Sequence, residues 1–594
     1  MTDPPEPVLL EIATREDTRP RVGGRPAVPR WALLAPAPAA LAVLTVLVLP
    51  LLATVWDSVH RDGRFVGLAE YGVVLDDGRV QRAISNSVLW VLFALVLGAA
   101  GLGLAELARR AGGSRTLLLA VLAAPTAVSA LVTGIAFRLI FDPDPDRGTV
   151  AALAAGLLPG PGPRVDLLGP DRIALLLGSA FAWSWVGLAV VVFAAGLRAV
   201  PTDRLRMARA AGVGPLTRLG RVLLPALRPV IAVVLVTLLV AAARMFDLVL
   251  VAVPGSVQES ADVVSLQWLR RQGDLTEGRR AALVVLLTLF LAAAALVAVA
   301  GGSTRRSLAV PAPGDPDPAP PRRPGWRWTL RAAGLLALAL WLVPFLVLMA
   351  ISVHEPARAA VAGWWSGGLS VLSVQPYADA FASGELGGAL VGTAARATVA
   401  TAGLLLLALP AAYALAWGGL RRRSARRLAA LLAVLAVLPV QVYAGPLGSA
   451  LGGARGLGAP SVLAAVHAAI GVPFAVLLLR GAFATVPPGE VTRERLDGGE
   501  WQAATVVCAA RWESVVAVAV LEFVLVWNDL VVGLLLGGPG SRLVTLALLG
   551  EARQFATNSA TLAAGAVVVT AVPLALVLVT GRWLIRGLAA GVAR

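Results

Sequence analysis

Apolar stretches of roughly 20 residues recur along this chain, separated by shorter polar segments that are rich in arginine. A helix of that length crosses the hydrocarbon core of a bilayer and satisfies its own backbone polar groups there. The pattern therefore predicts an all-α polytopic membrane protein with about 12 transmembrane helices. We expect the spans near residues 31–56, 84–108, 116–141, 173–197, 224–250, 281–301, 330–353, 391–416, 427–447, 461–481, 512–536 and 562–581.

A proline-rich segment separates these spans into two sets of six. It occupies residues 303–329 and includes PAPGDPDPAPPRRPG, a composition that neither spans a membrane nor packs as a helix. Each set has a short basic loop after its second span and a long loop after its fourth. We therefore expect two tandem six-helix repeats of the same orientation, residues 31–302 and 330–594, preceded by an N-terminal tail, residues 1–30.

The composition supports a membrane protein and excludes several functions. Of the 594 residues, 58% are hydrophobic and only 14% are charged, whereas in soluble domains about a quarter are charged. All 51 basic residues are arginine, so the chain lacks the lysine of an ATP-binding P-loop. The single cysteine, Cys508, and the three scattered histidines offer neither a disulfide nor a metal-ligand cluster. We therefore expect no cofactor and no enzyme, since no nucleophile–base pair is visible either.

The arginines also predict how the chain is oriented. The net charge of +16 would suggest nucleic-acid binding in a soluble protein, but here the arginines flank apolar spans. Arginine-rich segments include 109–115, 198–221 and 421–427. Counting them places both termini in the cytoplasm of a bacterial plasma membrane, although the four arginines of loop 253–280 argue the other way. The first 30 residues lack a cleavable signal pattern, which predicts a retained first span.

One basic, glycine-broken segment, RMARAAGVGPLTRLGRVLLP (residues 206–225), is unlike the apolar stretches that flank it. We predict a short amphipathic helix over 203–211, a turn at Gly212, a second helix from Pro215 and a kink where Pro225 enters the bilayer. Such a helix–turn–helix would form a compact knob on the cytoplasmic side. An ordinary basic loop that only sets the topology is the alternative.

The spacing Ala208-x3-Gly212-x12-Pro225 resembles the cytoplasmic signature of permease subunits of binding-protein-dependent ABC importers. A second copy is similar through LDGGEWQ (496–502), with Gly498 as its turn glycine. In this family the two loops form coupling helices that dock on separate ATPase subunits, which hydrolyse the ATP. The resemblance assigns the first coupling loop to Arg206, Ala208, Gly212, Pro215 and Pro225, and the second to Thr492, Asp497, Gly498 and Trp501.

Nearly the whole chain shares this resemblance, and several stretches are similar to carbohydrate permeases. FDLVLVAVPG (246–255) resembles the MalF-like partner, especially its alpha-glucoside members, and VWNDLVVGLLL (526–536) resembles the MalG-like partner. The resemblance implies two type I permease domains fused head to tail, the MalF-like one first. In the coupling loops Arg206 and Thr492 replace a family glutamate, and Ala510 replaces a proline. These departures leave open a permease that has lost activity.

Charged and aromatic residues within the spans are candidates for the substrate path. A charge at membrane depth costs about 2.5–3.5 kcal/mol on insertion scales and usually faces a cavity or a partner. A sugar needs carboxylates and amides for its hydroxyls and an aromatic face for its apolar side. The residues that offer this combination are Trp183, Trp185, Arg244, Asp247, Glu522, Trp527, Asn528 and Asp529. Alternatively, Arg244 and Asp247 form a structural ion pair and Asp529 lies in water; His467 is expected to pack.

We therefore expect the transmembrane permease subunit of an ATP-driven, binding-protein-dependent ABC importer for a carbohydrate, an oligosaccharide or alpha-glucoside. The expected partners are ABC ATPase subunits, an extracytoplasmic solute-binding protein, the sugar and the lipid bilayer, without nucleic acid. The alternatives are a proton-coupled secondary transporter of about 12 helices, and a fused ABC permease for iron or thiamine. The informative loop follows the fourth span rather than the second, which favours the importer.

Overall fold

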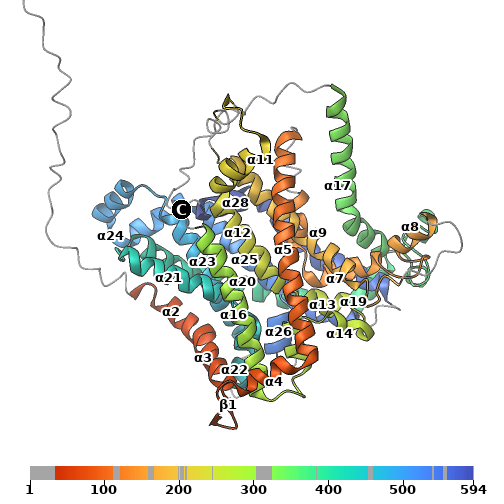
Figure 1. Cartoon of the computed structure of the whole chain (residues 1–594), viewed down its shortest axis with the longest axis horizontal. Helices are drawn as coiled ribbons and strands as arrows, with labels where there is room; N and C mark the ends of the chain where they lie inside the picture. Colours follow the sequence, from red (N-terminus) through yellow and green to blue (C-terminus); the bar gives the residue numbers. More distant parts are fainter. Residues whose placement is uncertain are drawn as a thin grey trace, which may run out of the picture.

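Helices make up almost all of the described structure (Figure 1). The computed structural model describes residues 34–592 except 112–118, 120, 158–165, 199, 201–206, 208–209, 244, 303–323, 383, 453–458, 538–540 and 553–557. Within these residues the strands are β1 (His60–Arg61) and β2 (Arg64–Phe65), an antiparallel hairpin with His60 opposite Phe65. The all-α membrane fold that the apolar pattern predicts is confirmed.

The helices fall into two sets along the chain. The first set comprises α2 (Ala37–Val43), η1 (Leu44–Val48), α3 (Leu49–Ser58), α4 (Ala69–Asp76), α5 (Gly78–Ala111), η2 (Ala124–Ala127), α7 (Ala130–Ile140), α8 (Thr149–Leu157), α9 (Ile173–Arg198), α11 (Pro215–Arg218), η3 (Leu219–Leu223), α12 (Leu224–Ala243), α13 (Phe246–Ala252), η4 (Gly255–Val257), α14 (Gln258–Ala261), α15 (Val264–Arg270) and α16 (Glu277–Gly302). The second set comprises α17 (Pro324–Ser352), α18 (Pro356–Ala359), η5 (Gly368–Val371), α19 (Gln375–Ala382), α20 (Glu385–Trp417), α21 (Arg422–Ala436), α22 (Val440–Gly452), α23 (Ala459–Phe483), α24 (Pro488–Ala510), α25 (Trp512–Trp527), α26 (Val531–Leu536), α27 (Val544–Ala552) and α28 (Ser559–Val592).

Six of the described helices are long and apolar enough to cross a membrane without a bend. They are Ala37–Ser58, Gly78–Leu107, Ile173–Leu197, Glu385–Trp417, Pro460–Phe483 and Ser559–Leu584. Four further pairs of helices reach this length only together, so the described residues supply six to ten spans by length and composition. The helices α16 and α17 occupy the two remaining expected positions. Because α17 begins at Pro324, the linker ends earlier than predicted; its residues 303–323 and the tail 1–30 lie outside the described residues.

The third span of each set, expected near 116–141 and 427–447, is broken in the structure. The pairs are Val121–Ala127 with Ala130–Ile140, at 111°, and Arg423–Ala436 with Val440–Leu451, at 78°. In the first pair, the Ser129 hydroxyl accepts a hydrogen bond from the Val132 N–H at 3.1 Å and so caps a new helix. In the second pair, Pro439 lies at the break, where it has no N–H to continue the helical ladder.

The two sets of helices share one packing pattern. In the first set, α5 packs against α9 and α12, and α12 packs against α16. In the second set, α20 packs against α23 and α25, and α25 packs against α28. Each of these pairs holds the same place in the order of spans. The tandem repeat that the loop pattern predicts is therefore visible in which helices touch.

Contacts between the two sets are reciprocal. The first span of the second set, α17, packs on α7, and the first span of the first set, α3, packs on α22. Likewise, α28 contacts α7 and α16 contacts α22. Two repeats related by an axis exchange equivalent contacts in this way.

A hydrogen bond is repeated between the sets as well. Ser87 Oγ accepts from the Val264 N–H at 3.2 Å, and Thr393 Oγ1 accepts from the Val544 N–H at 3.0 Å. Val264 and Val544 begin α15 and α27, the helices that lie beyond the fifth span of each set. In both sets, a hydroxyl on the second span satisfies an N–H that the start of a helix leaves free.

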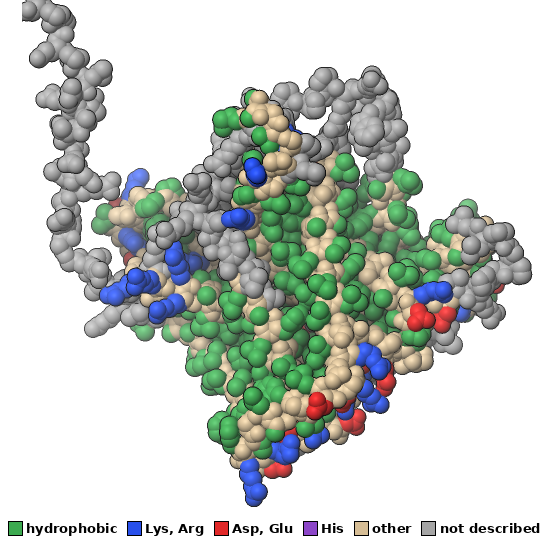
Figure 2. Space-filling model, viewed as in Figure 1, with side chains coloured by type: hydrophobic (Ala, Val, Ile, Leu, Met, Phe, Trp, Pro, Cys, Tyr) green, Lys and Arg blue, Asp and Glu red, His purple; other side chains and the backbone are tan. Residues whose placement is uncertain are grey.

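The surface has an apolar band. Figure 2 shows hydrophobic side chains across the middle of the molecule, with charged side chains gathered along the lower edge and at the left. Exposed residues of α5 and α20, among them Leu89, Val96, Val391 and Leu406, belong to the apolar surface. Such surface suits the lipid environment that helices of this length require. In Figure 1, α11 lies near the top and α24 at the left, whereas α4 and β1 lie at the bottom.

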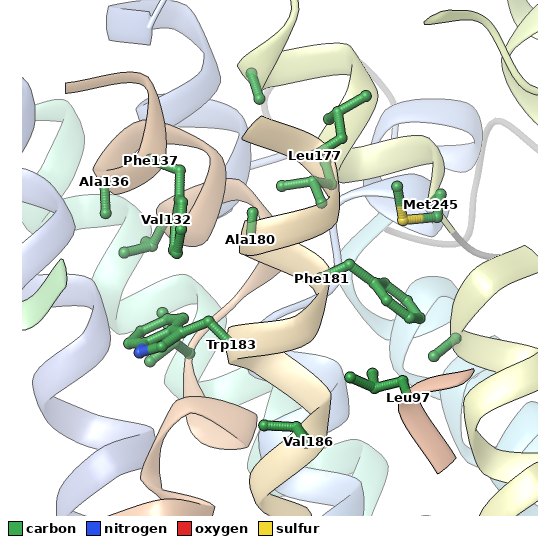
Figure 3. Packing of buried hydrophobic residues seen from close by; sticks show 14 of the residues in the cluster. Leu97, Val132, Ala136, Phe137, Leu177, Ala180, Phe181, Trp183, Val186 and Met245 are labelled. Carbon is green, nitrogen blue, oxygen red and sulfur yellow. The ribbon is translucent and has the colours of Figure 1, made fainter. Parts of the chain in front are cut away.

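The interior of the first set is apolar and aromatic around α9 (Figure 3). Trp183 and Phe181 leave this helix on opposite sides. The ring of Trp183 lies 5.8 Å from that of Phe137, and the ring of Phe181 lies 6.3 Å from that of Trp90. These aromatic contacts join α9 to the broken third span on one side and to the second span on the other.

Ion pairs hold the end of the molecule that carries the hairpin. Glu70, on α4, accepts hydrogen bonds from Arg61 and Arg279, which hold the pKa of this carboxyl below its ordinary value. Asp262 lies 3.0 Å from Arg270 but is almost fully buried, and this burial raises its pKa to about 6. The contacts of Glu70 join the hairpin, α4 and the start of α16, and that of Asp262 holds α15.

Candidate coupling segments and substrate path

The segment before the fifth span of the second set is an elbow. Its helix α24 consists of two arms, 488–498 and 500–510, joined at Gly499 with φ 77° and ψ −171°. Only glycine adopts this conformation readily. The predicted turn glycine, Gly498, is therefore wrong by one residue and stays within the first arm. The sequence offers two consecutive glycines, and the structure places the turn at the second.

The corresponding segment of the first set contains a similar turn. Gly212 has φ 70°, and α11 begins at Pro215, as predicted. Arg206 and Ala208 lie outside the described residues, as does most of the predicted helix over 203–211. The part that is described shows the predicted turn followed by the predicted helix, which leads into the fifth span.

The predicted kink at Pro225 is displaced. The fifth span bends by 69° between Leu219–Arg228 and Val230–Ala242, and so beyond Pro225. Just before Pro225, the π-helical turn η3 loosens the helix, which accommodates the proline's missing N–H. The next proline along the chain, Pro229, lies at the bend itself.

Two large apolar side chains flank the turn at Gly499. Leu496 is 82% exposed and Trp501 is 83% exposed. The first arm also carries Thr492 and Asp497, and several of its other residues are charged and exposed. An arm with this many charges does not lie in lipid. Exposed apolar side chains on such a surface indicate contact with another protein.

The candidate tryptophans of the substrate path hold helices together. Trp183 Nε1 donates to the Trp341 carbonyl at 2.9 Å, which joins α9 to α17 of the other set. Trp527 Nε1 donates to the Val569 carbonyl at 3.0 Å, and its side chain is 2% exposed. Trp185 is partly buried. The structure thus gives Trp183 and Trp527 defined packing roles.

Charged groups gather around Asp529. Its carboxylate accepts hydrogen bonds from the Val532 and Gly533 N–H groups at 3.4 and 3.1 Å, and so caps α26. His467 is buried, as expected, but its Nε2 also lies 3.7 Å from Asp529 Oδ2. Arg396, only 4% exposed, interacts electrostatically with the same carboxylate. Because the Asp529 side chain is 12% exposed, it does not lie in open water.

Asn528 and Glu522 lie close to this group in the sequence. Asn528 Nδ2 donates to the Ala127 carbonyl at 3.0 Å, which ties the second set to the broken third span of the first. Glu522 is 5% exposed and lies beside Gly471, where an added Cβ would be 2.5 Å from Oε2. Glycine therefore makes room for this carboxylate. Arg244 and Asp247 are the remaining charged candidates. Of these two, Arg244 lies outside the described residues.

A cavity of about 580 Å³ lies between the two sets. Its wall comes from α7, α13, α14 and α15 on one side and from α26 and α27 on the other. Arg138, Gln258 and Gln272 supply the polar side chains of the described wall, and the rest is mainly aliphatic. None of the eight path candidates contributes to that wall. Asp247, in the first turn of α13, and Asp529, just before α26, come nearest to it along the chain.

Sequence reasoning did not single out Arg138 or Arg396. Both are charged residues inside predicted spans, 116–141 and 391–416. The free-energy cost of a charge in hydrocarbon was the signal that could have found them. Only the charged residues of the fifth spans were named as candidates on this ground. The charged neighbour of Arg396, Asp529, comes from a segment far away in the chain, and no spacing in the sequence indicates that contact.

The two sets of spans, each with a glycine turn before its fifth span, define a polytopic membrane permease built from tandem units. Residues 91–305 match the family described as the binding-protein-dependent transport system inner membrane component. The match covers this part of the chain only.

Curated relatives match less than half of this chain at a time. The alpha-glucoside transport system permease protein AglF of Rhizobium meliloti is 28% identical over 269 residues, which cover 43% of this chain and 78% of AglF. AglG of the same organism is 29% identical over 224 residues, 36% of this chain and 58% of AglG. The trehalose/maltose permease protein MalF of Thermococcus litoralis is 27% identical over 235 residues, 38% of this chain and 77% of MalF. This chain is thus larger than one such permease.

A solved structure is also similar. It is that of a bacterial ABC transporter involved in the import of the acidic polysaccharide alginate, at 20% identity and a TM-score of 0.40. The alignment covers 46% of this chain and 95% of that one.

Proposed function

We propose that the chain is the transmembrane permease subunit of an ATP-driven, binding-protein-dependent importer whose cargo is a carbohydrate. The observation that carries this proposal is the pair of glycine elbows, at Gly212 and Gly499, each directly before a fifth span. A motor that grips both elbows moves both sets of helices together. Separate ATPase subunits hydrolyse the ATP, so the chain itself needs no catalytic residue.

In this proposal, Leu496 and Trp501 are the docking surface of the second elbow. Both are large, apolar and exposed beside the turn. A cleft in an ATPase subunit that covers them gains the free energy of burying apolar surface, about 1.5–3 kcal/mol for each side chain. The other coupling residues that the resemblance assigns keep their role in the proposal.

The proposed orientation follows from the arginine-rich segments. The elbows and both termini face the cytoplasm of a bacterial inner membrane. The cavity lies beyond the opposite end of the fifth spans, where α13 follows α12 and α26 follows α25. A solute-binding protein outside the membrane delivers the substrate at that end. Rocking of the two sets then opens the path to each side in turn.

The proposed units are two permease domains, residues 31–302 and 324–594, joined by the linker 303–323, because α17 begins at Pro324. The lengths of the matched segments support this division, because each relative aligns with less than half of the chain. The names of AglF and of the Thermococcus litoralis protein favour a carbohydrate over iron or thiamine. The family match of residues 91–305 favours the importer over a proton-coupled secondary transporter.

Co-purification tests the proposal. The full chain is expressed in membranes together with ABC ATPase subunits of carbohydrate importers from its own genome. We expect the wild-type chain to retain an ATPase subunit, and the variant Leu496→Ser/Trp501→Ala to retain at least about tenfold less at equal membrane level, since two buried apolar contacts are lost. The matched control is Leu369→Ser, a leucine 86% exposed outside the elbows. Equal retention by the double variant and the control would contradict the docking surface, and no retention by the wild type would contradict the importer.

A further inference from the structure

Three side chains connect the two arms of the second elbow with the second span. Glu500 begins the second arm, Arg495 lies on the first arm, and Tyr413 lies near the end of α20. Tyr413 donates its hydroxyl to Glu500 Oε2 at 2.9 Å, and Arg495 Nε donates to the same oxygen at 3.0 Å. One carboxylate oxygen therefore holds both the first arm and the span. We name these three residues the elbow clasp.

The clasp is fastened to the ends of two spans. Arg495 Nη2 donates to the Trp417 carbonyl at 2.9 Å, the last residue of α20. Trp417 Nε1 in turn donates to the Phe483 carbonyl at 3.1 Å, the last residue of α23. Hydrogen bonds thus run from the elbow to α20, and from there to the end of α23.

The surroundings of the clasp make these hydrogen bonds strong. Tyr413 is 3% exposed, and the side chains of Arg495 and Glu500 are 28% and 34% exposed. Hydrogen bonds to ionised groups are roughly twice as strong as neutral ones, and partial burial limits their screening by salt. The exposed pair of Arg493 with Asp497 on the same arm, 80% and 60% exposed, contributes far less.

The backbone at Gly499 does not fix the angle between the two arms, so side chains must set it. Gly499 has no side chain, and the space where its Cβ would lie is open. Besides the clasp, Gln502 Nε2 donates to Glu494 Oε2 across the turn at 2.9 Å, but both groups are exposed. The half-buried connection between the arms is therefore the one through Glu500.

We propose that the elbow clasp of Tyr413, Glu500 and Arg495 is a positioning device that makes the second elbow and α20 move as one body. This inference rests on the proposed function, because it concerns how the stroke of the motor reaches the membrane. The span α20 packs against α23 and α25 and carries Arg396, which faces the charge of Asp529. A displacement of the elbow is thereby passed to the buried charges of the second set.

A distance measurement tests the clasp without any motor subunit. Cys508 is the only cysteine, so Cys508→Ala provides a background for spin labels at Arg493→Cys on the first arm and Val391→Cys on α20. Val391 lies about 33 Å from Tyr413 along the helix, which suits pulsed electron paramagnetic resonance. We expect one narrow distance distribution in the parent, and a distribution at least about twofold broader with Glu500→Gln or Tyr413→Phe, because a turn without restraint samples more angles. An unchanged distribution in both variants overturns the proposal.

A second measurement separates a coupling role from a merely structural one. In membranes that contain the ATPase, Glu500→Gln and Tyr413→Phe keep Leu496 and Trp501 in place, so ATPase retention stays at the wild-type level. Uptake per ATP hydrolysed falls by about fivefold, within the range by which coupling contacts act. The matched control is Tyr377→Phe, which removes the hydrogen bond of another tyrosine hydroxyl, to Ser352 at 2.8 Å.

The outcomes of the two experiments are distinguishable. Broader distances together with normal uptake per ATP show that the clasp does not transmit the stroke, and this overturns the proposal. Broader distances in a chain that retains no ATPase refute the proposed function and, with it, the coupling role. Broader distances with retained ATPase and reduced uptake per ATP support the inference.

Discussion

The two sets of helices pack in the same arrangement, but the side chains in their interiors differ. Ser87 and Thr393 accept equivalent hydrogen bonds, and three residues further along the same helices stand Trp90 and Arg396. Trp90 lies against Phe181 in an aromatic cluster of the first set. At the corresponding place of the second set, Arg396 faces the charges around Asp529.

The fourth spans differ in the same manner. Phe181 and His467 are equally far in the sequence from Val200 and Val486, the buried valines that precede the two elbow segments. Phe181 is an aromatic ring among apolar neighbours, whereas His467 Nε2 lies 3.7 Å from Asp529 Oδ2. The second set therefore bears the free-energy cost of buried charge where the first set avoids it. The shared arrangement of helices does not require this free-energy cost. The buried charges therefore indicate a specialised role for the second set.

The attachment of the segment before α15 in the first set, and before α27 in the second, differs as well. In the first set, Asn86 Nδ2 donates to the carbonyls of Ser260 and Asp262 at 2.8 and 2.9 Å. In the second set, the equivalent position is Gly392, and a Cβ there would lie 2.7 Å from the Arg542 carbonyl. One set secures the segment with an amide and the other by close approach of the backbone. The same position is thus reached by two different chemical means.

The largest effect is expected at the turn of the second elbow. Gly499→Val places a β-branched side chain at φ 77°, which the arms cannot keep. We expect loss of ATPase retention and of uptake to below about a tenth of the wild type, in line with strain of 1–3 kcal/mol or more. Gly498→Ala is the matched control, because an added Cβ there meets the flexible Gln502 side chain. The measurement is co-purified ATPase per inserted chain, and a stronger defect in the control would restore Gly498 as the turn.

An intermediate effect is expected from the buried charges. Arg396→Leu leaves Asp529 without its nearby cation, so we expect uptake to fall about tenfold with little change in the amount of folded protein. Trp90→Ala, at the equivalent position, removes packing instead, and it should lower the free energy of unfolding by about 3 kcal/mol while leaving the uptake of the surviving protein intact. Uptake and melting temperature are measured for both variants. If both lose only stability, the second set has no specialised role.

The smallest effect is expected from the repeated hydroxyls. Thr393→Val leaves the buried Val544 N–H without a partner, which should lower the free energy of unfolding by about 1–2 kcal/mol. Ser87→Ala should have a smaller effect, because Asn86 also holds the segment in the first set. Thermal unfolding in detergent gives both values. Equal shifts would show that Asn86 adds nothing to the attachment.

Much of the frame could be predicted from the sequence. The apolar stretches correctly marked the long helices, and the proline-rich segment separated two sets that pack alike. Gly212 and Pro215 were placed correctly, because each has a backbone preference that is independent of its neighbours. The breaks within the third spans were not predicted, because capping by Ser129 and the missing N–H of Pro439 outweigh continuous hydrophobicity. Among the buried charges, the sequence singled out Asp529 but not its contacts with Arg396 and His467.

What the sequence alone determined are properties that act on each segment separately: lipid favours a long apolar helix, and a single proline or glycine limits its own backbone. Only the tertiary structure decided between residues that the local sequence makes equally suitable. Gly499 rather than Gly498 makes the turn, and Arg396 and His467 rather than other polar residues lie around Asp529. These choices depend on contacts between helices that are distant in the sequence, and the free energy of such a contact exists only once the helices have packed.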